Sequence, residues 1–197
     1  MDARAVRQVQ GHTINSGAQP AIKLRIADDL AYLGSLRFLI KGIAEAEVFL
    51  FADADSEKQI TRLLVIQFEG FLDNNNYTYE YPIRNTVMLG QHQYVHDTFV
   101  YAIAPDLEEA DSDSAQTFGF ILKQGYTLPI EIVSCRLIRA LDSTRRTEIL
   151  FSYAEDLSLR GLSADNISSD NRPTPPYAYL EEELLRQALS SFTVAAG

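Results

Sequence analysis

Two apolar segments in the first half of the chain have the pattern of paired β-strands. Residues 46–51 and 60–71 are rich in branched and aromatic side chains, and the polar sequence Asp-Ala-Asp-Ser at 53–56 separates them. Asp and Ser side chains bond to nearby backbone and favour tight turns, so we expect an antiparallel hairpin over residues 46–71. Both alternating sets of side chains in 60–71 are apolar, which predicts a central strand covered on both faces.

Further strands are predicted in the middle and second half of the chain. Residues 77–81 alternate strictly, and residues 94–103 are rich in aromatic and β-branched side chains, so each segment predicts a strand. Residues 132–153 contain two apolar segments around a polar turn, which is the pattern of a second hairpin.

Two segments predict helices, and one segment is ambiguous. Asp113 or Ser114 can cap a helix that ends before Gly125. Residues 179–192 predict a second helix, because apolar residues recur there at near-helical spacing. These residues are Leu180, Leu184, Ala188 and Phe192. Residues 28–44 fit a helix and a strand equally well.

Together these elements predict an α+β fold. Consecutive strands joined by short polar turns favour an antiparallel meander sheet of about five or six strands, with helices packed on one face. In this scheme residues 1–20 form a flexible N-terminal arm and residues 21–160 form the α+β domain. Residues 161–176 form a loop rich in Pro, Ser and Asn, and residues 177–197 contain a C-terminal helix that docks on the domain or on a partner chain.

The net charge indicates which classes of partner to expect, and the cysteine content indicates the cellular compartment. The chain has 27 acidic and 17 basic residues and a net charge of −10, and such a field repels phosphate groups. We therefore expect no nucleic-acid partner and no membrane partner. There is a single cysteine, Cys135, residues 1–10 contain no apolar run, and no segment has the ~20 apolar residues of a membrane span. These features favour a cytoplasmic location.

Recognisable catalytic and cofactor motifs do not occur in the sequence. The phosphate-binding glycine patterns, the G-x-S-x-G elbow, C-x-x-C and H-E-x-x-H are all missing, so we expect no cofactor. His92 and His96 could share a metal ion on a helix. On the strand that their neighbours predict they would be about 13 Å apart, so no metal site is expected.

Two local patterns suggest a binding surface. Glu69 follows buried positions at the end of the most apolar strand, where burial could raise its pKa and allow acid–base chemistry; the exit of the strand into solvent explains it equally well. Tyr77, Tyr79 and Tyr81 share one face of their predicted strand, which suits a recognition surface or an ordinary half-buried face. The candidate binding residues are Glu69, Asn74, Tyr77, Tyr79, Tyr81, His92, Tyr94 and His96.

Three functions are compatible with these patterns. The leading hypothesis is a noncatalytic binding or interaction protein that uses one face of the sheet, or a cavity between the sheet and a helix that could take a small molecule, with the tyrosines near its mouth. The first alternative is a small enzyme with an acid–base site around Glu69, His92 and His96. The second alternative is an oligomeric structural protein that pairs with copies of itself through sheet edges or C-terminal helices.

Overall fold

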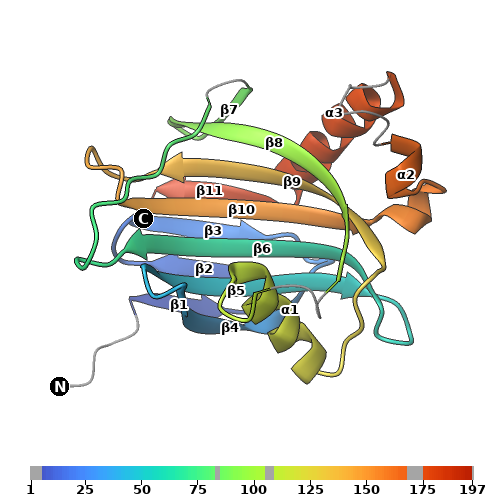
Figure 1. The fold of residues 1–197 in the computed structure, drawn as a ribbon, viewed down its shortest axis with the longest axis horizontal. Coiled ribbons are helices and arrows are strands. Elements are labelled where there is room, and N and C mark those ends of the chain that lie inside the picture. Colours follow the sequence, from blue (N-terminus) through green and yellow to red (C-terminus); the bar gives the residue numbers. More distant parts are fainter. Residues whose placement is uncertain (1–5, 83–84, 105–108, 168–174, 197) are drawn as a thin grey trace.

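The computed structural model of the chain describes residues 6–82, 85–104, 109–167 and 175–196. Within these residues the strands form two antiparallel sheets, one of seven strands and one of four (Figure 1). The larger sheet contains, in spatial order, β4 (Ala31–Ile40), β5 (Ala44–Ala54), β6 (Ile60–Phe71), β10 (Thr147–Asp156), β9 (Glu131–Ala140), β8 (His92–Ala102) and β7 (Thr86–Leu89). The smaller sheet contains β1 (Arg7–Gln10), β2 (Thr13–Ser16), β3 (Ile22–Ile26) and β11 (Phe192–Ala196). The helical elements are α1 (Asp113–Lys123), a 3-10 turn (Leu157–Arg160), α2 (Ala164–Ile167) and α3 (Pro175–Ser190).

The two predicted hairpins form as expected. β5 pairs with β6, and β9 pairs with β10, both antiparallel. In the first turn, Asp55 Oδ1 accepts hydrogen bonds from the backbone N–H groups of Glu57 (2.8 Å) and Gln59 (2.9 Å). In the second turn, Asp142 Oδ2 accepts one from the N–H of Thr147 at 3.0 Å. Short acidic side chains therefore close both turns, as the sequence pattern indicates.

One face of the large sheet, which we call the core face, packs against the small sheet and α3. Its side chains and those of the covering elements form one apolar cluster. Ile14 and Leu24 of the small sheet and Leu184 of α3 are fully buried in it. Phe192, expected at the end of the last helix, instead begins β11, and its ring stacks on Phe151 with centroids 4.4 Å apart. The apolar stripe of α3 is thus buried in the core of its own chain.

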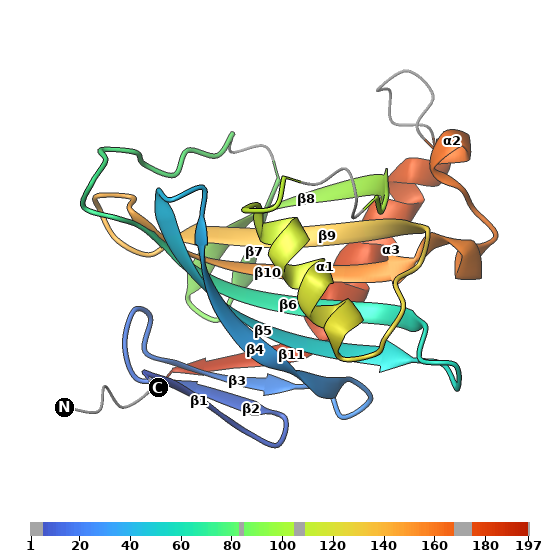
Figure 2. The same cartoon turned by 60° about the horizontal axis from the view of Figure 1, so that its bottom comes forward.

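The opposite face of the large sheet, which we call the α1 face, is partly covered by α1 (Figure 2). Ile121 of α1 packs with Val48 and Leu50 of β5. Gly34 of β4 makes this docking possible, because a Cβ atom there would lie 2.7 Å from Cζ of Phe120. Gly34 also has φ of +140°, a conformation that side chains rarely adopt, at an irregularity in the β4–β5 pairing.

The positions of the helices and the number of strands differ from the prediction of one meander with helices on one face. α1 and α3 lie on opposite faces of the large sheet (Figure 2). The reason is that the central strands are apolar on both faces, so both faces need a cover. Residues 31–40, within the ambiguous segment, form strand β4.

Within residues 1–20, which the sequence predicts to be a flexible arm, the described part contains two short strands. Residues 7–10 and 13–16 form β1 and β2, which pair with each other, and β2 pairs with β3. These strands are polar at most positions and bury few side chains. For this reason the pattern of apolar residues does not predict them. In the segment expected to be a loop, residues 164–167 form α2; residues 1–5 and 168–174 lie outside the described part.

Candidate functional site

A cavity of about 410 Å³ lies between α1 and the α1 face of the large sheet. Val65 of β6 and Leu150 of β10 contribute apolar wall from the sheet, and Phe118 contributes apolar wall from α1. Thr117 and Asp113, also on α1, add polar groups. A concave, mainly apolar space with a few polar groups is the usual form of a small-molecule site.

Polar side chains on β9 and β10 form the floor of this cavity. The hydroxyl groups of Ser134 and Ser152 are 2.8 Å apart and bond to each other. Arg136 makes two bonds to the carboxylate of Asp97, at 2.8 and 3.2 Å, and its guanidinium group lies 4.6 Å from the ring centroid of Phe99. The positive charge of Arg136 is therefore already balanced within the cavity wall.

A pair of carboxyl groups lies beside the cavity on the same face of the sheet. The register of β6 and β10 places Glu69 directly opposite Glu148. Glu148 leaves β10 on the same side as Leu150, which lines the cavity two residues away. Ala46 and Ala140 flank the pair on the neighbouring strands β5 and β9. The four-residue row thus contains two acids and no base.

Glu148 is buried without a partner for one of its oxygens. The residue is 5% exposed, and its Oε2 atom accepts no hydrogen bond from any residue that the structure describes. Burial, together with the charge of Glu69, raises the pKa of Glu148 to about 8. A perturbed acid of this kind is a typical mark of a functional site.

Glu69 has the hydrogen bonds that Glu148 lacks. Its Oε1 accepts a bond from the hydroxyl of Tyr79 at 2.7 Å, and its Oε2 accepts one from the side chain of Gln67 at 2.7 Å. Burial raises the pKa of Glu69, these two bonds lower it, and the charge of Asp113 raises it, so that the pKa lies above its ordinary value. Gln67 and Asp113 both line the cavity. Gln67 and Asp113 therefore link Glu69 to the edge of the cavity, although neither glutamate lines it.

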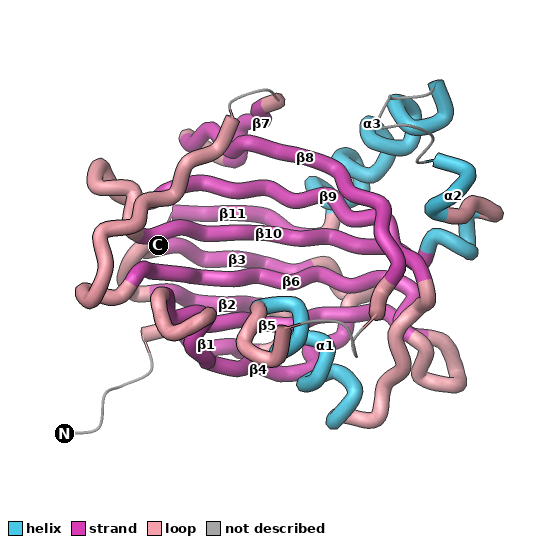
Figure 3. The backbone as a smooth tube through the Cα atoms, in the orientation of Figure 1, coloured by secondary structure: helices cyan, strands magenta, loops and turns pink. Residues whose placement is uncertain are grey.

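The tyrosine-rich segment lies over the end of the sheet as a loop and not as the predicted strand (Figure 3). The ring of Tyr79 stacks on Phe71 at 4.3 Å and on Tyr81 at 6.4 Å between centroids. Arg145 Nε donates to the carbonyl of Tyr79 at 2.6 Å and fixes the segment. Tyr77 is more than half exposed, and its ring centroid lies 5.9 Å from that of Phe71.

Asn74, the remaining candidate in this region, has a structural contact. Its side-chain amide donates to the carbonyl of Gly42 at 3.2 Å, and the neighbouring Asn75 donates to the carbonyl of Ile43 at 2.8 Å. These bonds attach the loop after β6 to the turn between β4 and β5.

The candidates on β8 lie on the other face of the sheet. Tyr94 is 1% exposed, and its ring packs against Phe151 on the core face. His96 is opposite Leu137, also on the core face, and His92 lies at the start of the strand next to the β7–β8 turn. The structure therefore brings Glu69 together with Tyr79 and Tyr81 but separates them from both histidines.

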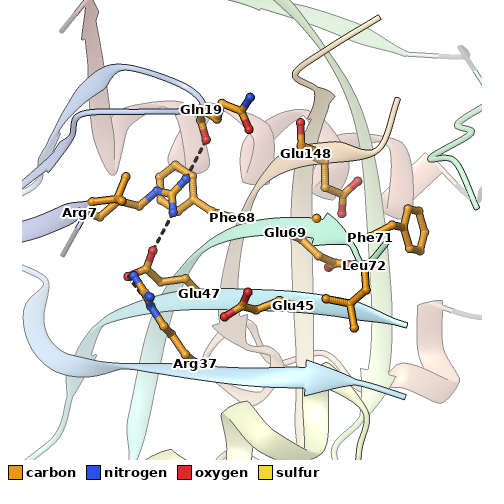
Figure 4. Close-up of a pocket in the computed structure, with 13 residues that line it drawn as sticks. Arg7, Gln19, Arg37, Glu45, Glu47, Phe68, Glu69, Phe71, Leu72 and Glu148 are labelled. Carbon is orange, nitrogen blue, oxygen red and sulfur yellow. Dashed lines mark hydrogen bonds and ion pairs between the residues drawn. The ribbon is translucent and has the colours of Figure 1, made fainter. Parts of the chain in front are cut away.

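A second depression, of about 350 Å³, lies near the end of β6 (Figure 4). Arg7 bonds to Glu47 at 2.7 Å and covers the ring of Phe68 at 3.9 Å, while Arg37 bonds to the other oxygen of Glu47 at 2.8 Å. Arg7 of β1 thus bridges to Glu47 of β5, and we interpret this cluster as the attachment of β1 to the large sheet. Both members of the carboxyl pair, Glu69 and Glu148, line this depression.

Comparison with protein family models, with curated protein sequences and with solved structures finds no match to this chain. Among the described helices, none is long and apolar enough to cross a membrane. Within the described residues, no three His, Cys, Asp or Glu side chains are grouped so that they could hold a metal ion.

Proposed function

We propose that this chain is a noncatalytic binding protein that takes a small, largely apolar molecule in the cavity between α1 and the large sheet. The observation that carries the proposal is the cavity itself, whose volume of about 410 Å³ lies within the range of known ligand sites. Its walls come from both the sheet and a helix, and Arg136, the cation of its floor, is paired with Asp97.

The placement of the histidines supports binding over catalysis. The acid–base alternative combines Glu69 with His92 and His96, which would have to reach the same reacting group. His96 leaves β8 on the core face, whereas Glu69 leaves β6 on the α1 face. Neither the cavity nor the carboxyl pair has an activated nucleophile among the residues that line it.

A cavity-filling substitution tests this proposal. Ser152 lies on the cavity floor and is partly buried, so Ser152→Phe would place a ring in the space that a ligand needs. Thr193→Phe adds the same ring at an exposed position of β11, remote in sequence and on the other sheet, and is the matched control. We expect hexanol, followed by methyl NMR titration, to bind the wild-type protein and the control but not Ser152→Phe. Equal binding by all three proteins would contradict the proposal.

A further inference from the structure

Two serine hydroxyl groups on the floor of the cavity leave one hydrogen without an acceptor. Ser134 on β9 and Ser152 on β10, which we call the serine pair, bond to each other at 2.8 Å. Neither hydroxyl group has another bond to a residue that the structure describes. Each hydroxyl group has one hydrogen to donate. Because a single bond joins the pair, one of the two hydrogens stays free, whichever oxygen is the donor.

This free hydrogen lies at the wall of the space that a ligand would fill. Ser134 is 3% exposed, and both serines line the cavity. A ligand that cuts a donor off from solvent without offering an acceptor loses affinity. A molecule that fills the cavity therefore binds better if it places an oxygen acceptor against the serine pair.

Arg136 adds a second donor beside the serine pair. It lies directly opposite Ser152 in the pairing of β9 with β10 and follows Ser134 by two residues on the same strand. Its Nε and Nη2 groups donate to Asp97, whereas Nη1 has no hydrogen-bond partner among the described residues. A carbonyl oxygen has two lone pairs and no hydrogen of its own, so it can accept from a serine and from Arg136 at once.

The charges around the cavity favour a neutral acceptor over an anion. Asp97 already balances the charge of Arg136, and Asp113 of α1 adds a negative charge to the wall. A carboxylate in this space would be repelled by Asp113 and would have no unpaired cation to bind. A ketone, aldehyde, ester or amide offers the acceptor without that repulsion.

We propose that the ligand of the sheet–helix cavity carries a neutral carbonyl group, whose oxygen accepts hydrogen bonds from the serine pair while the apolar part lies against Val65 and Leu150. This inference rests on the proposed function, because both concern the same cavity. Leu150 precedes Ser152 by two residues on β10, a separation of about 7 Å. A phenyl ring with its attached carbonyl group spans that distance.

Acetophenone and α-methylstyrene separate the carbonyl group from the apolar part. The two molecules have the same shape and differ only in the carbonyl oxygen, which a methylene group replaces in α-methylstyrene. Methyl NMR titrations measure the affinity of each probe for the wild-type protein and its variants. We expect both probes to bind the wild-type protein, because both fit the same apolar walls.

A double variant, Ser134→Ala with Ser152→Ala, tests the role of the hydroxyl groups. Because both partners of their bond are removed together, the fold should tolerate the change. We expect this variant to bind acetophenone roughly threefold to tenfold more weakly and α-methylstyrene as tightly as the wild-type protein does. Ser56→Ala with Ser143→Ala removes two exposed hydroxyl groups from turns and is the matched control, which should change neither affinity.

The outcomes distinguish this inference from the proposed function. An unchanged affinity for acetophenone in the cavity variant, or an equal loss of affinity for both probes, would overturn the carbonyl inference alone. If neither probe bound the wild-type protein, the cavity would not take a small apolar molecule, and the proposed function would fail together with the inference.

Discussion

Glu148 and Glu69 face each other across β10 and β6, and the row that they form on the α1 face contains only alanines on either side. A buried acid whose cross-strand neighbour is also an acid ionises only at a cost. Burial and the charge of Glu69 raise the pKa of Glu148 to about 8, so the stability of the protein should depend on pH through this residue.

The pair should make the wild-type protein less stable as the pH rises. The pKa of Glu148 is raised from its ordinary value of 4.5 to about 8 in the folded chain. Between these two pH values the folded state holds a proton that the unfolded state has lost, so the unfolding free energy falls across this window. The loss is about 1.4 kcal/mol for each unit of displacement.

Glu148→Gln should remove this dependence. We expect the variant and the wild-type protein to have similar stability near pH 5 and the variant to be more stable by a few kcal/mol near pH 9, as measured by chemical denaturation. A wild-type stability that is flat between pH 5 and pH 8, relative to the variant, would show that Glu148 titrates normally.

Removal of the hydroxyl group of Tyr79 should change the pKa of Glu69, the other member of the carboxyl pair. The bond from Tyr79 to Glu69 lowers the pKa of Glu69 against the effect of burial. Tyr79→Phe keeps the ring stacked on Phe71 but deletes that bond, so we expect the pKa of Glu69 to rise further. NMR titration of the side-chain carboxyl carbon of Glu69 measures this pKa. Tyr77→Phe is the control, because Tyr77 is exposed and has no bond to Glu69. A pKa that falls or stays constant in Tyr79→Phe contradicts the geometry.

The close approach of α1 to β4 predicts a specific cost at Gly34. Gly34→Ala places a Cβ atom against the ring of Phe120 at a backbone conformation that favours glycine. Gly42→Ala is the control: its φ of +65° lies in the left-handed region, which costs a side chain less than the +140° of Gly34, and a Cβ atom there meets no atom within 4 Å. We expect Gly34→Ala to be less stable than Gly42→Ala by about 1–3 kcal/mol and to weaken hexanol binding through displacement of α1. Equal thermal stability of the two variants would refute this contact.

The C-terminal helix should behave as part of the core. Leu184 is fully buried, whereas Tyr179 on the same helix is 70% exposed. A charge at Leu184 enters an apolar interface within the chain, so Leu184→Glu should lower the unfolding free energy by several kcal/mol. Tyr179→Glu introduces the same charge in solvent and should change it little. If Leu184→Glu instead left the melting temperature unchanged, the docking of α3 on this core would be wrong.

The strongly periodic parts of the fold could be predicted from the sequence. The hairpins around Asp55 and Asp142, the strand β8 and the helix α1 follow from apolar runs bounded by turn and cap residues. The small sheet could not be predicted, because β1 and β2 are short and polar. Its stability comes from pairing with β3 and from the buried side chain of Ile14.

The candidate site could be predicted only in part. Glu69 stands out because it ends an apolar strand, and the tyrosines stand out by alternation. Glu148 has no such signal, since it begins a hairpin strand among ordinary neighbours. Only the register between β6 and β10, strands that are distant in sequence, places it opposite Glu69. The same long-range pairing separates His96 from Glu69, which no local pattern indicates.

The position of a bound molecule tests the central claim most directly. Intermolecular nuclear Overhauser effects between hexanol and the methyl groups of the protein report which residues touch the ligand. We expect contacts from the hexanol chain to the methyl groups of Val65, Leu150 and Thr117, which converge on the cavity from β6, β10 and α1. Contacts confined to exposed methyl groups such as those of Ile130, or to the core-face side of the sheet, would contradict a ligand site between α1 and the large sheet.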